Sequence, residues 1–118
     1  MNKPEDRRKF ARLNILVDVT YQKRDSAKQE MLTVTRNISK GGICFVGYEQ
    51  LKENDIIDLN IYLPGKKEAI KAAGRVTWVK EFTIGDASKK RYDAGVEFTE
   101  INDKSLSELD KYMLYHLG

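Results

Sequence analysis

Short segments in which apolar and polar residues alternate are the feature that most constrains the fold of this chain. From residue 13 to residue 21 every odd position is apolar, and residues 57–63 show the same period of two. That period places the apolar side chains on one face of an extended strand. Together with segments rich in β-branched residues, the alternation predicts six strands, over residues 13–21, 31–35, 43–46, 57–63, 69–80 and 92–98.

The segments between these strands are too short for the crossover connections that parallel neighbours require. We therefore expect antiparallel strands that form a small barrel or sandwich. Pro64-Gly65 suits the centre of a type II turn, because proline fixes φ at one position and glycine supplies a positive φ at the next. Gly74 lies inside the fifth predicted strand and indicates a bulge or a bend.

The period changes near the C-terminus, where apolar residues at helical spacing predict an amphipathic helix over about residues 103–117. The apolar stripe consists of Leu106, Leu109, Met113 and Leu117. Ser105 and Glu108 have the spacing of a capping box, which would place the start of the helix at Ser105. A helix of this length is marginal alone in water, so its stripe must dock on the sheet. The predicted fold class is all-β with one C-terminal helix.

The composition excludes several classes of protein. With 118 residues, 41% of them hydrophobic and 33% charged, the chain can form one globular domain with a core. No apolar run approaches the roughly 20 residues of a membrane-spanning helix, and no apolar segment of a secretory signal follows Met1. The single cysteine, Cys44, excludes an internal disulfide. We expect a cytoplasmic protein without membrane insertion.

The excess positive charge is concentrated in residues 1–12, which we interpret as a flexible arm preceding the domain of residues 13–118. The arm holds five Lys/Arg and two Asp/Glu, a net charge of +3, and the remaining 16 Lys/Arg balance 16 Asp/Glu. A protein that binds nucleic acid polymers usually spreads basic residues over a broad face. A local cluster favours a small anionic ligand instead.

Two short motifs carry the candidate chemistry. Arg8 and Arg12 are four residues apart, a spacing that places both guanidiniums on one side of a helix or of a strand. Arginine forms bidentate hydrogen bonds with phosphate and with the O6/N7 edge of guanine. A solvated basic tail would have the same appearance, because such tails are common.

The second motif spans residues 37–42 and contains Asn37, Ser39, Gly41 and Gly42. These residue types are also ordinary turn material, since they cap themselves and tolerate positive φ. As a binding motif, the polar side chains of Asn37 and Ser39 would bond a base or a phosphate, and the two glycines would let the backbone approach the ligand closely.

The ordered pair Arg8-x-x-x-Arg12 and Asn37-x-Ser39-x-x-Gly42 resembles the signature of the PilZ domain family of cyclic di-GMP receptors, which is Arg-x-x-x-Arg followed by Asp/Asn-x-Ser-x-x-Gly. Residues 74–79 and 95–98 are similar to two strands of that family, so the resemblance covers nearly the whole chain. It implies a six-stranded antiparallel β-barrel with a flexible N-terminal arm that folds over the ligand.

The resemblance also implies roles for individual residues. Arg8 and Arg12 would hold phosphate and guanine, while the second motif, through Asn37, Ser39 and Gly42, would hold a guanine from the barrel side. Arg7 would add a third guanidinium, which in the family accompanies an intercalated dimer of the ligand. Asn37 stands where aspartate is commoner; its amide offers one oxygen where a carboxylate accepts two bonds from guanine.

The other notable side chains fit structural roles. Trp78 is expected to be a core or barrel-end aromatic, although a stacking platform is the alternative. Cys44 is expected to be a buried small residue, and His116 to lie at a helix C-terminus. One cysteine and one histidine do not suggest a metal site. No set of nucleophile, base and orienting group stands out, so we do not expect an enzyme or a bound cofactor.

The leading functional hypothesis is a cyclic di-GMP receptor that orders its N-terminal arm on ligand binding and signals to a separate protein partner. The alternative is a protein-interaction module of the same fold that does not bind nucleotide. A barrel that binds single-stranded nucleic acid would display aromatic residues beside basic ones on its strands. The aromatic residues Phe45, Trp78 and Phe98 are instead expected to face inward.

Overall fold

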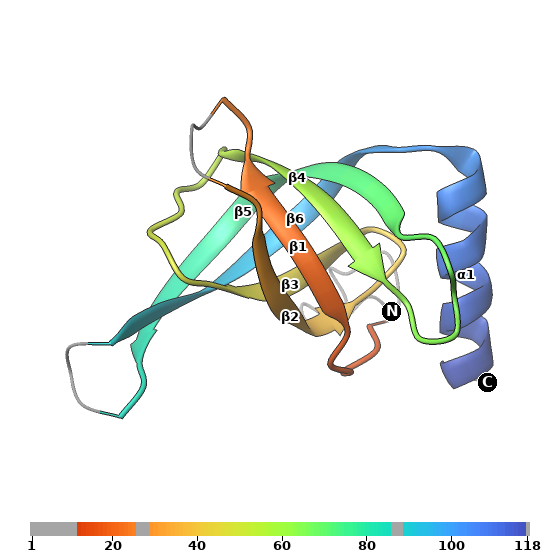
Figure 1. Ribbon diagram of the computed structural model, residues 1–118, viewed down its shortest axis with the longest axis horizontal. Helices are drawn as coiled ribbons and strands as arrows, with labels where there is room; N and C mark the ends of the chain where they lie inside the picture. The colour runs from red at the N-terminus through yellow and green to blue at the C-terminus, as the bar shows by residue number, and fades with distance from the viewer. Residues whose placement is uncertain (1–11, 26–28, 86–88, 118) are drawn as a thin grey trace, which may run out of the picture.

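Six antiparallel strands close a barrel, and one helix follows them (Figure 1). The computed structural model describes residues 12–25, 29–85 and 89–117. The strands follow one another around the barrel in the order β1-β2-β3-β6-β5-β4. The elements are β1 (Asp18–Lys23), β2 (Met31–Ile38), β3 (Gly42–Gly47), β4 (Ile56–Tyr62), β5 (Ile70–Thr83), β6 (Lys90–Ile101) and α1 (Asp103–Leu117). The predicted all-β fold with six antiparallel strands and a C-terminal helix is confirmed.

The first strand begins later than its alternation predicts. β1 starts at Asp18, where its pairing with both β2 and β4 begins. Before it, Leu13 forms an isolated antiparallel bridge with Ile38, through two backbone hydrogen bonds of 2.8 and 3.0 Å. Val17 is held against Thr35, which donates its backbone N–H to the Val17 carbonyl over 2.9 Å. The alternation therefore marks an extended segment that pairs with β2 at separate points before it becomes a strand.

The predicted turn and bulge are both confirmed. The N–H of Lys66 donates to the carbonyl of Leu63 over 3.1 Å, and Gly65 between them has a φ of 81°. The register of β5 against β6 shifts between Ala73 and Gly74. Two further shifts lie between Thr35 and Asn37 and between Val76 and Trp78. A bulge changes the face of the sheet on which the following side chains lie. These shifts therefore determine which side chains of β2 and β5 point outward.

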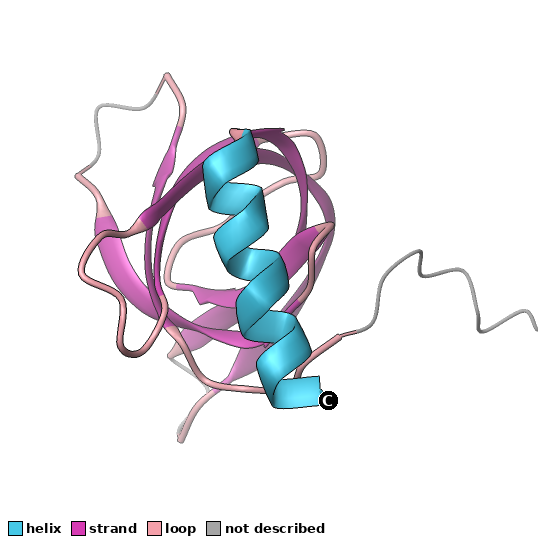
Figure 2. Cartoon of the chain, turned by 90° about the vertical axis from the view of Figure 1, so that its right-hand side faces the viewer, coloured by secondary structure: helices cyan, strands magenta, loops and turns pink. Residues whose placement is uncertain are grey.

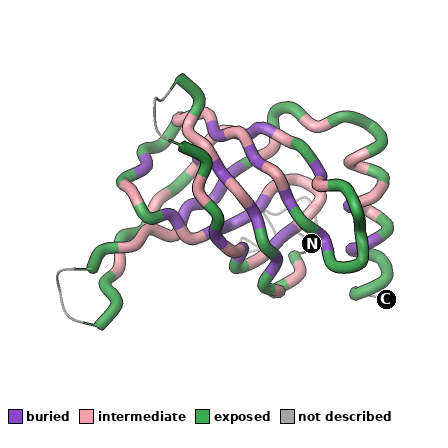
Figure 3. The backbone as a smooth tube through the Cα atoms, in the orientation of Figure 1, coloured by how far each residue is buried: buried purple, intermediate pink, exposed green. Residues whose placement is uncertain are grey.

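Buried residues from all six strands form the core of the barrel; Figure 3 marks the buried positions along the backbone in purple. Tyr21 and Phe45 are fully buried at its centre, with ring centroids 4.7 Å apart. Phe45 thus faces inward, as expected, and Phe98 is half-buried against the same core. The phenolic oxygen of Tyr21 accepts the N–H of Tyr48 over 3.0 Å, so its polar end is satisfied.

Helix α1 lies across one open end of the barrel (Figure 2). Leu109 and Met113 from the predicted stripe are buried in the core cluster, and Tyr112 joins them. The predicted helix bounds of about 103–117 are confirmed, but the predicted capping box is wrong, because the N-cap lies three residues before Ser105. Asn102 is the cap: its side-chain oxygen accepts the N–H of Ser105 over 2.7 Å, which satisfies a donor of the first turn. No helix in the described part of the chain is long and apolar enough to cross a membrane.

The docking of α1 predicts a large difference between two leucines of the same helix. Leu109→Ala should lower the free energy of unfolding by about 2–5 kcal/mol, because it leaves a cavity at a fully buried position. Leu114→Ala is the matched control: Leu114 is 65% exposed, so its loss should cost less than about 0.5 kcal/mol. Urea unfolding of both variants measures the difference, and equal losses would show that α1 does not depend on this contact.

Candidate functional site

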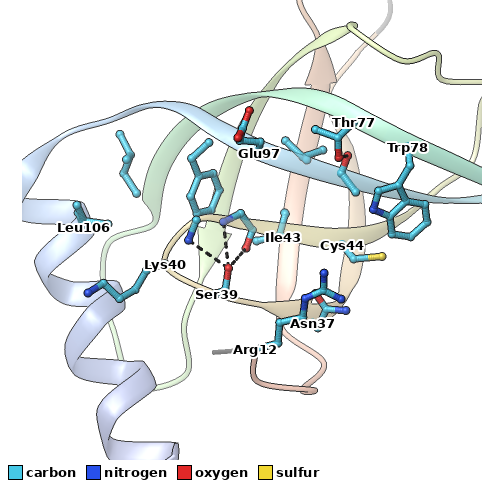
Figure 4. A pocket seen from close by; sticks show the side chains of 16 residues that line it. Arg12, Asn37, Ser39, Lys40, Ile43, Cys44, Thr77, Trp78, Glu97 and Leu106 are labelled. Carbon is cyan, nitrogen blue, oxygen red and sulfur yellow. Dashed lines mark hydrogen bonds between the residues drawn. The ribbon is translucent and has the colours of Figure 1, made fainter. Parts of the chain in front are cut away.

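A pocket of about 660 Å³ lies on the outer surface of the barrel, beside the turn between β2 and β3. It is lined by Arg12, by residues 37 and 39–44, by Thr77 and Trp78 of β5, by residues 95–98 and 101 of β6, and by Leu106 of α1 (Figure 4). Both predicted motifs contribute to this one pocket, although some 25 residues separate them in the sequence. The barrel topology brings them together because β2, β3, β6 and β5 are successive neighbours.

The floor of the pocket is one row of residues across these four strands. Asn37 pairs with Cys44, Cys44 with Gly95, and Gly95 with Trp78. Three strand spacings give the row a length of about 14 Å. Its centre consists of a cysteine and a glycine, whereas its two ends carry an amide and an indole. Because the two central residues are small, the floor is low between the amide and the indole. This shape suits a flat, polar molecule.

The bridge between Leu13 and Ile38 places Arg12 at the edge of the pocket floor. The Arg12 side chain is exposed, and no hydrogen bond or ion pair connects its guanidinium with another described residue. The positive charge of Arg12 nevertheless acts on the floor of the pocket, because it partly counteracts the rise in the pKa of the Cys44 thiol. A guanidinium that no described residue binds, held by its backbone at the rim of a pocket, is available for an anionic ligand.

Asn37 projects into the pocket from the bulge in β2. Its neighbours Thr35 and Ile38 are both fully buried, so the extra residue of the bulge turns Asn37 to the outside between two inward residues. Asn37 is half-buried, and among the described residues its carboxamide has no hydrogen-bond partner. Such a group can accept or donate hydrogen bonds to a ligand without breaking an existing bond.

Ser39 is the residue that shapes the turn. Its hydroxyl oxygen accepts the N–H of Gly41 over 3.1 Å and that of Gly42 over 3.2 Å, and its backbone N–H donates to the Gly42 carbonyl over 2.9 Å. At Gly42 any Cβ would collide with the carbonyl oxygen of Val96, so only glycine lets β3 and β6 approach here. Ser39 thus acts as the self-capping turn residue that the sequence analysis gave as the structural interpretation of this motif.

Trp78 faces the pocket, and its interpretation as a core or barrel-end aromatic is wrong. Val76 is fully buried, and strict alternation would bury Trp78 as well; the extra residue in β5 after Val76 turns Trp78 outward, where it is 41% exposed. The indole lies over Gly95, at which any Cβ would collide with the ring. The sequence signal that could have found it is the glycine opposite the tryptophan, which opens space for a ring on the outer face.

Cys44 is buried as expected, but in the floor of the pocket. Burial raises the pKa of its thiol to about 11, with a smaller contribution from the charge of Asp93. The thiol is therefore protonated at neutral pH and is neither a nucleophile nor an anion there. Among the described residues no group of histidine, cysteine and carboxylate side chains is placed to hold a metal ion.

The other charged side chains at the rim have partners. Lys40 lies 3.4 Å from Asp110 of α1, and Glu97 lies 3.1 Å from Arg75. Arg12 and Asn37 are therefore the polar side chains most available to a ligand. Of the seven predicted ligand-binding residues, five line the pocket: Arg12, Asn37, Ser39, Gly41 and Gly42. Arg7 and Arg8 lie outside the described residues, as does most of the predicted arm.

The chain is similar in sequence pattern and in structure to known proteins. A family model described as the PilZ domain matches residues 6–115. The Bacillus subtilis inhibitor of motility, MotI/DgrA, is 25% identical, with a TM-score of 0.73 over 99% of this chain and 56% of that chain. No curated protein sequence matches the chain.

Two more distant structures share the fold. The K. pneumonia MrkH–c-di-GMP complex is 17% identical, with a TM-score of 0.71 over 95% of this chain and 52% of that one. The PilZ domain with c-di-GMP of YcgR from Escherichia coli is 11% identical, with a TM-score of 0.70 over 93% of this chain and 91% of that one. The chain thus spans about half the length of MotI/DgrA and MrkH and nearly all of the YcgR domain.

The contact between Trp78 and Gly95 predicts a spectroscopic change. In Gly95→Ala the new methyl group must displace the indole from the pocket, so the emission of this single tryptophan should shift to longer wavelength. The variant should also lose about 1–3 kcal/mol of stability, as overpacked sites do. Lys80→Ala, an exposed change two residues along β5, is the control and should leave the spectrum unchanged. A folded Gly95→Ala variant with the original spectrum would contradict the placement of Trp78.

Proposed function

The chain belongs to the PilZ domain family, and from this premise we propose that it binds cyclic di-GMP in the pocket between Arg12 and Trp78. The main support for the proposal is the row from Asn37 to Trp78. It joins an amide to an exposed indole beside the Arg12 guanidinium, and neither the amide nor the guanidinium has a partner among the described residues. Cyclic di-GMP offers the matching groups: flat purines, hydrogen-bonding base edges and phosphates. MrkH and the PilZ domain of YcgR each form a complex with this ligand.

Each residue has a role that its surroundings support. Arg12 binds a phosphate or the O6/N7 edge of a guanine, because its fork matches either one. Trp78 stacks on the face of a base, an interaction that any purine satisfies. Asn37 bonds the edge of a base, while Ser39, through its bonds to Gly41 and Gly42, positions the turn that presents Asn37.

The proposal also covers the N-terminal arm and the protein partner that receives the signal. Arg7 and Arg8 keep the roles that the family resemblance implies, with the ligand as an intercalated dimer. Ligand binding orders the arm of residues 1–12, and the surface so formed acts on a separate protein partner in the cytoplasm. Ordering a segment costs conformational entropy, which the ligand contacts must offset.

Calorimetric titration with cyclic di-GMP tests the binding step, with GMP as the control ligand. Binding should be saturable, and its stoichiometry distinguishes one ligand from an intercalated pair. Arg12→Ala should weaken binding roughly 10- to 100-fold, as expected for the loss of hydrogen bonds to a charged ligand. Added salt should weaken binding as well, because the contacts pair opposite charges.

Arg24→Ala is the matched control for this titration. Arg24 carries the same charge but binds Asp58 and Glu100 away from the pocket, so its loss should leave the affinity unchanged. Wild-type affinity in Arg12→Ala would remove Arg12 from the site. No binding at tens of micromolar ligand would favour the protein-interaction module that does not bind nucleotide. Because Trp78 faces outward, a single-stranded oligonucleotide belongs among the competitors, and displacement of the ligand by it would favour a nucleic-acid binder.

A further inference from the structure

Few side chains of this pocket could distinguish one base from another. Trp78 contacts the face of a base, and stacking scarcely distinguishes one purine from another. The Ser39 hydroxyl is engaged with the turn, and Glu97 is paired with Arg75. Among the described residues, Arg12 and Asn37 remain as side chains whose hydrogen-bonding groups are available for a base edge.

No residue in the described part of the chain holds the Asn37 side chain in one orientation. A carboxamide presents an acceptor and a donor side by side, and rotation by half a turn exchanges them. Hydrogen bonds from neighbours normally fix which way an asparagine points. Asn37 has no such bond from any described residue, so the ligand decides which of its two atoms faces which part of the base.

An amide that can turn in this way matches either purine. With adenine, its oxygen accepts the N6 amino group while its NH₂ donates to N1. With guanine, its oxygen accepts the N1–H while its NH₂ donates to O6. A carboxylate at the same position would only accept. It would suit the N1–H and N2–H of guanine, and against adenine it would face the lone pair of a ring nitrogen.

We infer that Asn37 makes this pocket tolerant of adenine, so that the chain binds a mixed cyclic dinucleotide of one guanine and one adenine about as well as cyclic di-GMP. The mixed ligand keeps a guanine for Arg12, whose donors match the O6/N7 edge, and presents its adenine to Asn37. A ligand with two adenines would face Arg12 with an amino group and binds more weakly. This inference rests on the proposed function, since it concerns the same site.

The affinities of the wild-type protein for three ligands test this without any variant. Titration with cyclic di-GMP, the mixed guanine–adenine cyclic dinucleotide and cyclic di-AMP should give affinities for the first two within about tenfold, with cyclic di-AMP clearly weakest. Rejection of the mixed ligand by 100-fold or more, with cyclic di-GMP bound, would overturn the inference and leave the proposed function intact. Failure to bind any of the three would overturn both.

Asn37→Asp then tests whether this residue causes the tolerance. The variant should raise the ratio of the two dissociation constants, mixed ligand over cyclic di-GMP, by roughly tenfold or more, because one bidentate pair discriminates bases by about that factor. Asn37→Ala is the matched control and should weaken both ligands with little change in their ratio. An unchanged ratio in a folded Asn37→Asp protein, checked by its thermal unfolding, would overturn the assignment to Asn37.

Discussion

The register between four neighbouring strands is the constraint on which the site depends. It aligns Asn37, Cys44, Gly95 and Trp78 in one row on the outside of the barrel. Two of the four residues face outward only because an extra residue interrupts the alternation, once in β2 and once in β5. Without these bulges, the amide and the indole would point toward the core, and the pocket would have no polar or aromatic end.

The backbone bridge at Leu13 connects the first motif to this row. It holds the end of the basic segment against β2, next to the turn that Ser39 organises. Arg12 consequently reaches the pocket from outside the sheet, while the row supplies the floor. Helix α1 contributes to the same region, since Leu106 lines the pocket and Asp110 pairs with Lys40 of the turn. A ligand in this pocket would therefore touch elements from both ends of the chain.

Most of the fold was predictable because it follows from local rules. A period of two indicates strands, short connections exclude crossover helices, and Pro64-Gly65 fits only certain turns. The orientation of Trp78 was not predictable from its own strand, because the bulge arises from pairing with β6. The same holds for the helix cap: Asn102 and Ser105 both suit the position, and the point at which β6 ends decides between them. The second motif was visible as turn material, whereas its place opposite Arg12 depends on the closed barrel.

The proposed ligand site is one pocket, with this row as its floor. Amide chemical shifts measured during a titration with cyclic di-GMP test it most directly, because each residue reports separately. The largest shifts are expected at Gly41, Gly42 and Gly95 and at the indole N–H of Trp78. Shifts centred instead on Arg24 and Asp58, which line a separate pocket, would contradict this assignment.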